Sequence, residues 1–229
     1  MDDPIVYPGR PGLSHDHSFV GNNTANAFSS VRSLRAGSTT CKRFGDTAAY
    51  WMPTLLLDSQ PVEPRDATIY YRRKTIGPVR AFPQGLRMIA GSSKATSPQD
   101  LRVAFWNCGA QTGIPPAADV PTCPAGRRSD LRLHVNFPSC WDGVHRDASD
   151  HQSHMAYALR GVCPADHPVA VPAISVIFRY PTAGGPGMTL ASGGQYSAHA
   201  DFFNAWKQGS LVSLVRDCLN TLRHCAQGQ

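Results

Sequence analysis

Apolar and polar residues alternate along several stretches of this chain and predict β-strands. In Leu131–Phe137 (LRLHVNF) every second residue is apolar, and the residues between them are Arg, His and Asn. A period of two places the apolar side chains on one face of a strand. The same alternation, or a short run of apolar and aromatic residues, predicts further strands within Asp46–Leu57, Ala67–Arg73, Gly85–Gly91, Val103–Cys108, Val171–Tyr180 and Met188–Ser192.

Helical spacing is confined to short segments. Ala25–Arg35 has apolar residues three apart, Ser210–Arg223 carries an apolar stripe, and Asp201–Gln208 is also predicted to be helical. Gly and Pro occupy 39 of the 229 positions, which favours turns and short strands. At 229 residues the chain is long enough for one core, so we predict a single domain over residues 1–229. Because strands do not alternate regularly with helices, we do not expect a doubly wound sheet. The expected fold is a mainly β, antiparallel β-sandwich or jelly-roll-like arrangement with a few short helices.

The seven cysteines are dispersed and contain no C-x-x-C pair, which argues against a zinc ribbon. Dispersed cysteines in a turn-rich chain are typical of disulfides and an oxidising, extracellular compartment. At most three bridges can form; Cys218 and Cys225 are candidates for one, and Cys123 could hold the loop Thr112–Arg128. The first residues do not resemble a leader, so export would mean that Met1 replaces a removed one.

The net charge of +6 comes from scattered arginines. No dense basic run with interleaved aromatics is present, so we expect no nucleic-acid partner. No apolar run approaches the roughly 20 residues that span a bilayer, so we expect no membrane partner. A basic surface fits a soluble protein, or one attracted to acidic polysaccharide or cell wall.

A monomer is expected. Nucleophile-elbow, P-loop and dinucleotide motifs are missing.

Three polar segments hold most of the chemistry-bearing side chains: Ser14–His17, Pro138–Tyr157 and His199–Trp206. We expect the fold to bring them together into one polar cleft. The predicted catalytic residues are Asp142, His154, His199, Asp201, His15 and His17. The predicted substrate-binding residues are Trp141, Tyr157, Arg87, Asn204 and Trp206. Rings beside acid and amide groups suit a sugar, whereas Trp51 and Trp106 lie in apolar runs and are assigned to the core.

Two catalytic chemistries fit these residues. Glycoside hydrolysis needs paired carboxylates, and Asp142 and Asp201 are the candidates, although each could instead cap a turn or orient a histidine. A polysaccharide lyase would use His154, Tyr157 or His199 to remove a proton and Arg87 to neutralise a uronate.

A metal centre is a further hypothesis. His15 and His17 are two residues apart, so on a strand both imidazoles point to one face. With His154 or His199 they could hold Zn or Cu, although no cofactor is required by the sequence. Each histidine is equally consistent with an ordinary hydrogen-bonding role.

The chain also resembles the DUF1996 family of secreted fungal and actinobacterial domains. The resemblance rests on Asp3–Val6, Ser14–His17, Tyr50–Pro53, Phe82–Met88, Phe137–Gly143, Asp150–Tyr157, Cys163–Val169 and His199–Trp206, in order along nearly the whole chain. It implies export and action on extracellular polysaccharide. The family pattern is similar to G-H-V-H where this chain has Ser14–His17, which favours the two histidines over Asp16 as a functional pair.

We therefore expect a secreted carbohydrate-active enzyme, a glycoside hydrolase or polysaccharide lyase, whose partner is a cell-wall or plant polysaccharide. The alternatives are a non-catalytic carbohydrate-binding module and a histidine-coordinated Zn or Cu metalloprotein.

Overall fold

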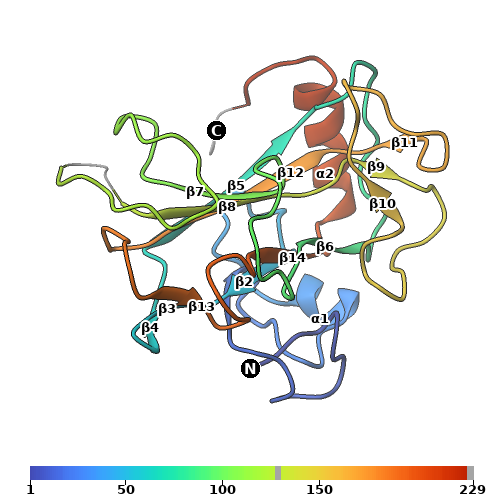
Figure 1. Cartoon of the computed structure of the whole chain (residues 1–229). Helices are drawn as coiled ribbons and strands as arrows, with labels where there is room; N and C mark the ends of the chain where they lie inside the picture. The colour runs from blue at the N-terminus through green and yellow to red at the C-terminus, as the bar shows by residue number, and fades with distance from the viewer. Residues whose placement is uncertain (127–129, 226–229) are drawn as a thin grey trace.

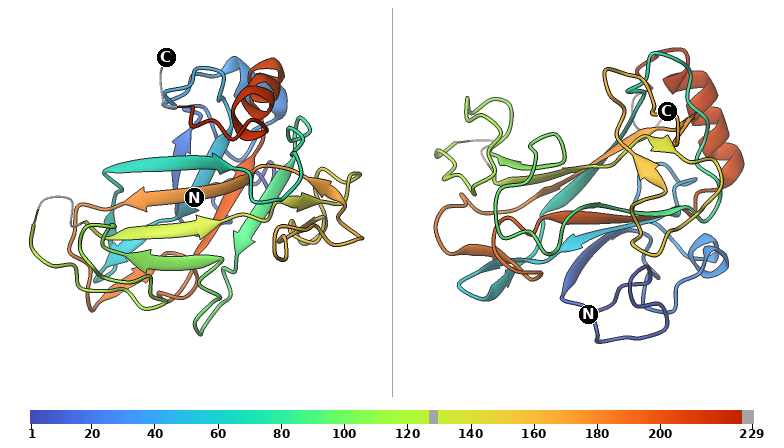
Figure 2. Two further views of the ribbon diagram at one scale, coloured as in Figure 1. Left: turned by 90° about the horizontal axis from the view of Figure 1, so that it is seen from above. Right: turned by 45° about the vertical axis from the view of Figure 1, so that its right-hand side comes forward.

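Two four-stranded antiparallel sheets face each other in the computed structural model, which describes residues 1–126 and 130–225 (Figure 1). The first sheet has the strand order β1 (His17–Gly21), β2 (Ala49–Pro53), β14 (His199–Phe203) and β6 (Arg87–Gly91). The second sheet, seen face-on in the left view of Figure 2, has the order β5 (Asp66–Arg72), β12 (Ala173–Arg179), β8 (Arg132–Asn136) and β7 (Ala104–Asn107). The predicted mainly β, sandwich-like fold is confirmed.

Smaller elements complete the chain. One three-stranded sheet contains β13 (Met188–Leu190), β3 (Leu55–Leu57) and β4 (Gln60–Val62). Another contains β10 (Met155–Ala156), β9 (Cys140–Trp141) and β11 (Val169–Ala170). The helices are α1 (Val31–Ala36) and α2 (Gln208–Leu214), and α2 continues as a π-helix over Val215–Leu219.

The main core fills the space between the two sheets. Tyr50 and Phe202 of the first sheet and Val176 and Phe178 of the second are fully buried in one apolar cluster, which Leu211 of α2 joins. Burying each such side chain stabilises the fold by roughly 1.5–3 kcal/mol. A second, smaller cluster lies on the outer face of the first sheet and consists of Ile5, Leu34, Ala49, Trp51, Phe203 and Ala205. The N-terminal segment and α1 therefore cover this outer face.

Most predicted strands are present with shorter ends. The helix predicted over Ala25–Arg35 is the short α1, which begins after Ser30 in a capping box. The stripe over Ser210–Arg223 forms α2 and the π-helix. The helix predicted over Asp201–Gln208 is wrong, because residues 201–203 belong to β14. All five residues of this central strand are buried, so the alternation that marks a half-exposed strand is missing.

Three disulfides join Cys108 to Cys123, Cys140 to Cys163 and Cys218 to Cys225, and Cys41 is free. The predicted limit of three bridges and the Cys218–Cys225 pair are confirmed. Cys123 holds the predicted loop to the end of β7; residues 127 and 128 of that loop lie outside the described residues. Such bridges are typical of an oxidising compartment. Within the described part of the chain, no helix combines the length and apolar character needed to cross a bilayer.

This cysteine pattern predicts the result of thiol counting. Alkylation of the denatured, unreduced protein should add one adduct, on Cys41, and alkylation after reduction should add seven. In the folded protein the reaction should be slow, because burial and the nearby Asp46 raise the pKa of the Cys41 thiol to about 12. Mass spectrometry measures all three values. More than one adduct before reduction would contradict the three bridges.

Candidate functional site

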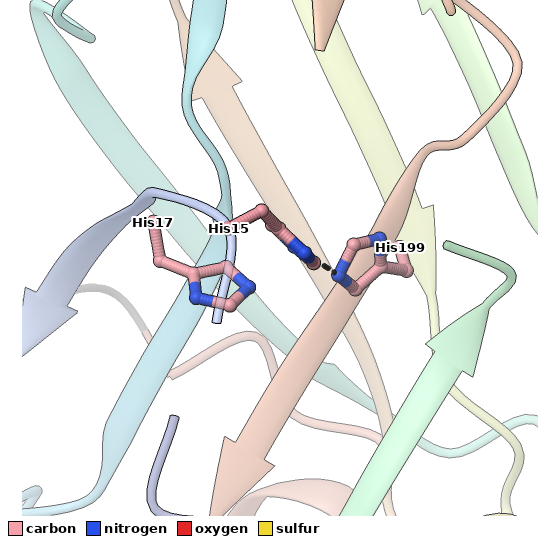
Figure 3. A group of neighbouring side chains, drawn as sticks. All are labelled: His15, His17 and His199. Carbon is pink, nitrogen blue, oxygen red and sulfur yellow. Dashed lines mark hydrogen bonds between the residues drawn. The ribbon is translucent and has the colours of Figure 1, made fainter. Parts of the chain in front are cut away.

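Three histidines from two distant segments of the sequence meet on the outer face of the first sheet (Figure 3). His15, His17 and His199 each bring one ring nitrogen within 4.8 Å of the others. The closest pair is His15 Nε2 and His199 Nε2, which are 3.2 Å apart. The rings of His15 and His17 have their centroids 4.2 Å apart. We call these three residues the histidine cluster.

Strand register explains why the cluster forms. His17 begins β1 and lies opposite Pro53 of β2. β14 pairs with the other side of β2, and there Asp201 lies opposite Trp51. The two strands are antiparallel, so His199, two residues before Asp201, is level with Pro53, two residues after Trp51. Residues two apart on a strand share a face. The side chains of His17 and His199 therefore flank Pro53 on one face of the sheet.

Gly91 allows β6 to approach β14 beside the cluster. It pairs with His199 and has a φ of +82°. A Cβ at this position would lie 2.4 Å from the carbonyl oxygen of Ala198 and 2.9 Å from the Cα of His199. Glycine is therefore required here both by space and by backbone conformation.

Hydrogen bonds orient two of the three rings. His199 Nδ1 lies 2.9 Å from the carbonyl oxygen of Ser197, and His17 Nδ1 lies 3.1 Å from that of Asp2. A carbonyl only accepts, so each Nδ1 carries the hydrogen and each Nε2 keeps its lone pair. His17 Nε2 is buried and has no hydrogen-bond partner among the described residues. Metal-binding histidines commonly show this arrangement, with one nitrogen bonded to a carbonyl and the other free.

Burial also keeps the three imidazoles neutral. Burial lowers the pKa of His15, and the negative charge of Asp16, which acts in the opposite direction, offsets this only in part. Burial lowers the pKa of His199 to about 4. The pKa of His17 falls well below its usual value through burial and then through the neighbouring His15 and His199. Near pH 7 all three rings are therefore in the form that binds metals.

Asp201 lies directly behind the cluster. Its Oδ2 is 3.9 Å from His199 Nε2, and the side chain is fully buried. Neither carboxylate oxygen has a hydrogen-bond partner among the described residues. Burial, and then the charge of Asp3, raises the pKa of Asp201 well above its usual value. Asp16 instead accepts a hydrogen bond from Thr54 Oγ1 at 2.8 Å, in agreement with the choice of the two histidines over Asp16.

The other predicted catalytic residues lie in a different place. Asp142 and His154 line an open pocket of about 720 Å³, which we call the acidic pocket. The residues lining it are Asp142, His145, Asp147, Ala148, Ser149, Ser153, His154, Asp166 and His167. The expectation of one shared cleft is thus replaced by two groups of polar residues. The sequence patterns did not single out His145, Asp147, Asp166 and His167, although Asp–His pairs within four residues of each other were a usable signal.

Two of the predicted substrate-binding residues lie in the interior. Trp206 is 2% exposed, and its Nε1 donates to the hydroxyl of Tyr71 within the main core. The buried Asn204 donates to the carbonyl of Pro83. Neither side chain offers a surface to a sugar, so both have a structural role here. Trp51 and Trp106 are buried, as predicted.

The remaining three predicted binding residues are accessible. Trp141 is half-buried, and its Nε1 donates to the carbonyl of His145. Tyr157 is 43% exposed. Arg87 is half-buried and pairs with Asp147, which lines the acidic pocket.

Comparison with known proteins identifies a family. A family model described as a domain of unknown function, DUF1996, matches residues 3–206, which include the histidine cluster and the acidic pocket. Searches of curated proteins and of solved structures find no match. The match spans nearly the whole chain, and this protein therefore belongs to the DUF1996 family.

Proposed function

We propose that this protein binds one divalent transition metal ion through His15, His17 and His199, and that it acts on carbohydrate outside the cell. The observation that carries the metal centre is the meeting of three neutral imidazoles from two distant segments. In a tetrahedral site with metal–nitrogen bonds of about 2.0–2.1 Å, ligand nitrogens lie about 3.3 Å apart. The 3.2 Å between His15 Nε2 and His199 Nε2 fits this spacing.

The ligand set suits a catalytic centre. Imidazole nitrogens bind Zn and Cu well, and three protein ligands leave a coordination position open. His15 is the partly exposed member of the cluster, so solvent or substrate would approach from its side. A bound ion with an open position supplies Lewis-acid activation of a water or substrate oxygen.

Metal analysis tests this proposal. The protein is stripped with a chelator and then titrated with Zn²⁺ or Cu²⁺, and retained metal is measured after gel filtration. We expect one ion per chain and a higher melting temperature, because an ion that binds only the folded state stabilises it. Protein that retains neither ion would rule out the metal centre.

Replacing Asp201 with asparagine should separate metal binding from stability. The carboxylate lies close enough to the cluster to support the ion, so we expect affinity to fall about 10–100-fold. The metal-free variant should be at least as stable as the parent, because a buried carboxyl group without a partner is replaced by a neutral amide.

Chelator competition measures the affinity of Asp201→Asn, and thermal unfolding measures its stability. Asp217→Asn is the matched control, since Asp217 is exposed on the π-helix outside the histidine cluster and its replacement should leave the affinity unchanged. Equal affinity for Asp201→Asn and the parent would exclude Asp201 from the metal site.

Action on an extracellular polysaccharide is supported by different observations. The acidic pocket is open, has the volume of a small-ligand site and combines carboxylates with imidazoles. The three disulfides support export. Asp142 and His154 would act from this pocket, in either hydrolysis or elimination.

A panel of polysaccharides, with and without added metal, distinguishes the outcomes. New reducing ends without ultraviolet absorbance from a new double bond indicate hydrolysis, and that absorbance indicates elimination. Retention of a glycan without products indicates a binding module. Neither products nor retention would refute the carbohydrate proposal and leave the metal centre standing.

A further inference from the structure

The acidic pocket is built on a covalently fixed frame. The loop between β9 and β10 supplies Asp142, Asp147 and His154, and the segment before β11 supplies Asp166 and His167. β9 pairs with both β10 and β11, and the Cys140–Cys163 disulfide joins β9 to the second segment. The loop between β9 and β10 and the segment before β11, which line the pocket, are thus held together before any ligand binds.

His154 supplies a buried acceptor without a partner. The residue is 2% exposed and lines the pocket, and its Nε2 lies 2.7 Å from the carbonyl oxygen of Arg87. Because that carbonyl only accepts, Nε2 carries the hydrogen and Nδ1 keeps a lone pair. Nδ1 is buried and has no hydrogen-bond partner among the described residues. An acceptor in this state is satisfied by a ligand that donates an O–H or N–H.

The rest of the lining is also rich in acceptors and negative in charge. Asp142, Asp147 and Asp166 contribute three carboxylates. Each is close to a histidine: Asp142 to His145 at 2.6 Å, Asp147 to His151 at 2.7 Å and Asp166 to His167 at 3.0 Å. Arg87 lies 3.4 Å from Asp147. Among the lining residues there is no lysine or arginine, and Arg87 is already paired with Asp147, so a carboxylate-bearing ligand would meet three carboxylates without an unpaired arginine or lysine of the lining to bind it.

We infer that the acidic pocket binds a sugar unit that offers hydroxyl or amino hydrogens and carries no carboxylate. His154 Nδ1 and the aspartate oxygens accept hydrogen bonds from it. This local preference is opposite to that suggested by the net charge of +6, which acts over the whole surface. The inference rests on the proposed carbohydrate function and is independent of the metal centre.

Binding of short oligosaccharides to the full chain tests the inference by calorimetry. The probes are neutral cello-, xylo- and laminari-oligosaccharides, amino-sugar chitosan oligomers and acidic oligogalacturonate. We expect a neutral or amino-sugar probe to bind at least about 10-fold more tightly than oligogalacturonate. The neutral and amino-sugar arms then show whether hydroxyl or ammonium hydrogens are preferred.

Two variants locate the binding. His154→Leu keeps a buried side chain of similar size and removes both ring nitrogens, including the acceptor Nδ1. Asp166→Asn removes a carboxylate whose side chain is 77% exposed, so its folding is not at risk. We expect each to weaken binding about 10-fold or more. Asp217→Asn, an exposed carboxylate on the π-helix, is the matched control and should bind as the parent does.

The outcomes separate this inference from the function on which it rests. If the parent binds no probe at millimolar concentration, both the carbohydrate function and the pocket assignment fail. If the parent binds a neutral or amino sugar and both folded variants bind it equally well, the pocket assignment alone fails. Tighter binding of oligogalacturonate than of every other probe would also overturn the inference.

Discussion

Replacing His199 with alanine is expected to lower the affinity for Zn²⁺ or Cu²⁺ by more than about 100-fold, beyond the loss seen when only a supporting residue is changed. His199 Nε2 lies 3.2 Å from His15 Nε2, and its ring is fixed by the carbonyl of Ser197. Removing it leaves two imidazoles, which hold a divalent ion far more weakly than three. His17→Ala should have a similar effect. Competition with a chelator of known affinity measures both.

The matched control is His224→Ala, because His224 is exposed and outside the histidine cluster. This variant should bind metal as the parent does. Thermal unfolding of the metal-free variants shows whether the loss of a buried ring has disturbed the fold. A folded His199→Ala protein with parental affinity would refute the proposed ligand set.

The second large effect concerns stability and pH at Asp46. This buried carboxyl group accepts a hydrogen bond from the hydroxyl of Tyr50 at 2.8 Å. Tyr50 contacts the hydroxyl of Tyr71 at 2.6 Å, and Tyr71 accepts from Trp206 Nε1. Burial raises the pKa of Asp46 to about 7 from an ordinary 3.8, against the opposing hydrogen bonds from Tyr50 and Ala48.

The raised pKa determines the sign of the pH dependence. Below pH 3.8 the carboxyl is protonated in both folded and unfolded protein, so its contribution to stability is fully present. Between 3.8 and about 7 the unfolded chain ionises while the folded protein keeps its proton, so stability is lost as pH rises. A difference of about three pH units corresponds to on the order of 4 kcal/mol.

Asp46→Asn should therefore match the parent near pH 3.5 and exceed its free energy of unfolding by up to about 4 kcal/mol at pH 8. The buried histidines of the cluster contribute an opposite slope, but they are common to both proteins and cancel in the difference. Urea unfolding at several pH values measures this difference. A difference that does not change with pH would show that Asp46 does not titrate as proposed.

Local sequence patterns predicted much of the fold. The alternation in Leu131–Phe137 located β8, which has one buried and one partly exposed face. Val171–Tyr180 likewise located β12. The failure at residues 201–203 has a physical cause: β14 is paired on both sides and covered on both faces, so its sequence lacks a period.

The candidate site was predictable only in part. The spacing of His15 and His17 indicated two imidazoles on one face, and His199 was among the candidates to join them. That His199 joins them and His154 does not depends on the pairing of β1 and β14 with β2, which spacing along the chain does not encode. Trp206 appeared beside polar residues in the sequence, but its indole completes the buried Tyr50–Tyr71 network.

The position of Pro53 between the two histidines has a consequence for the rim of the first sheet. β1 is an edge strand, and β2 separates it from β14. An ion shared by His17 and His199 would cross-link the outermost strand to an interior one, over the top of the strand between them. Unpaired backbone groups on an edge strand invite pairing with other chains. Occupancy of the centre would thus also limit fraying of β1 and protect the protein from aggregation along that rim.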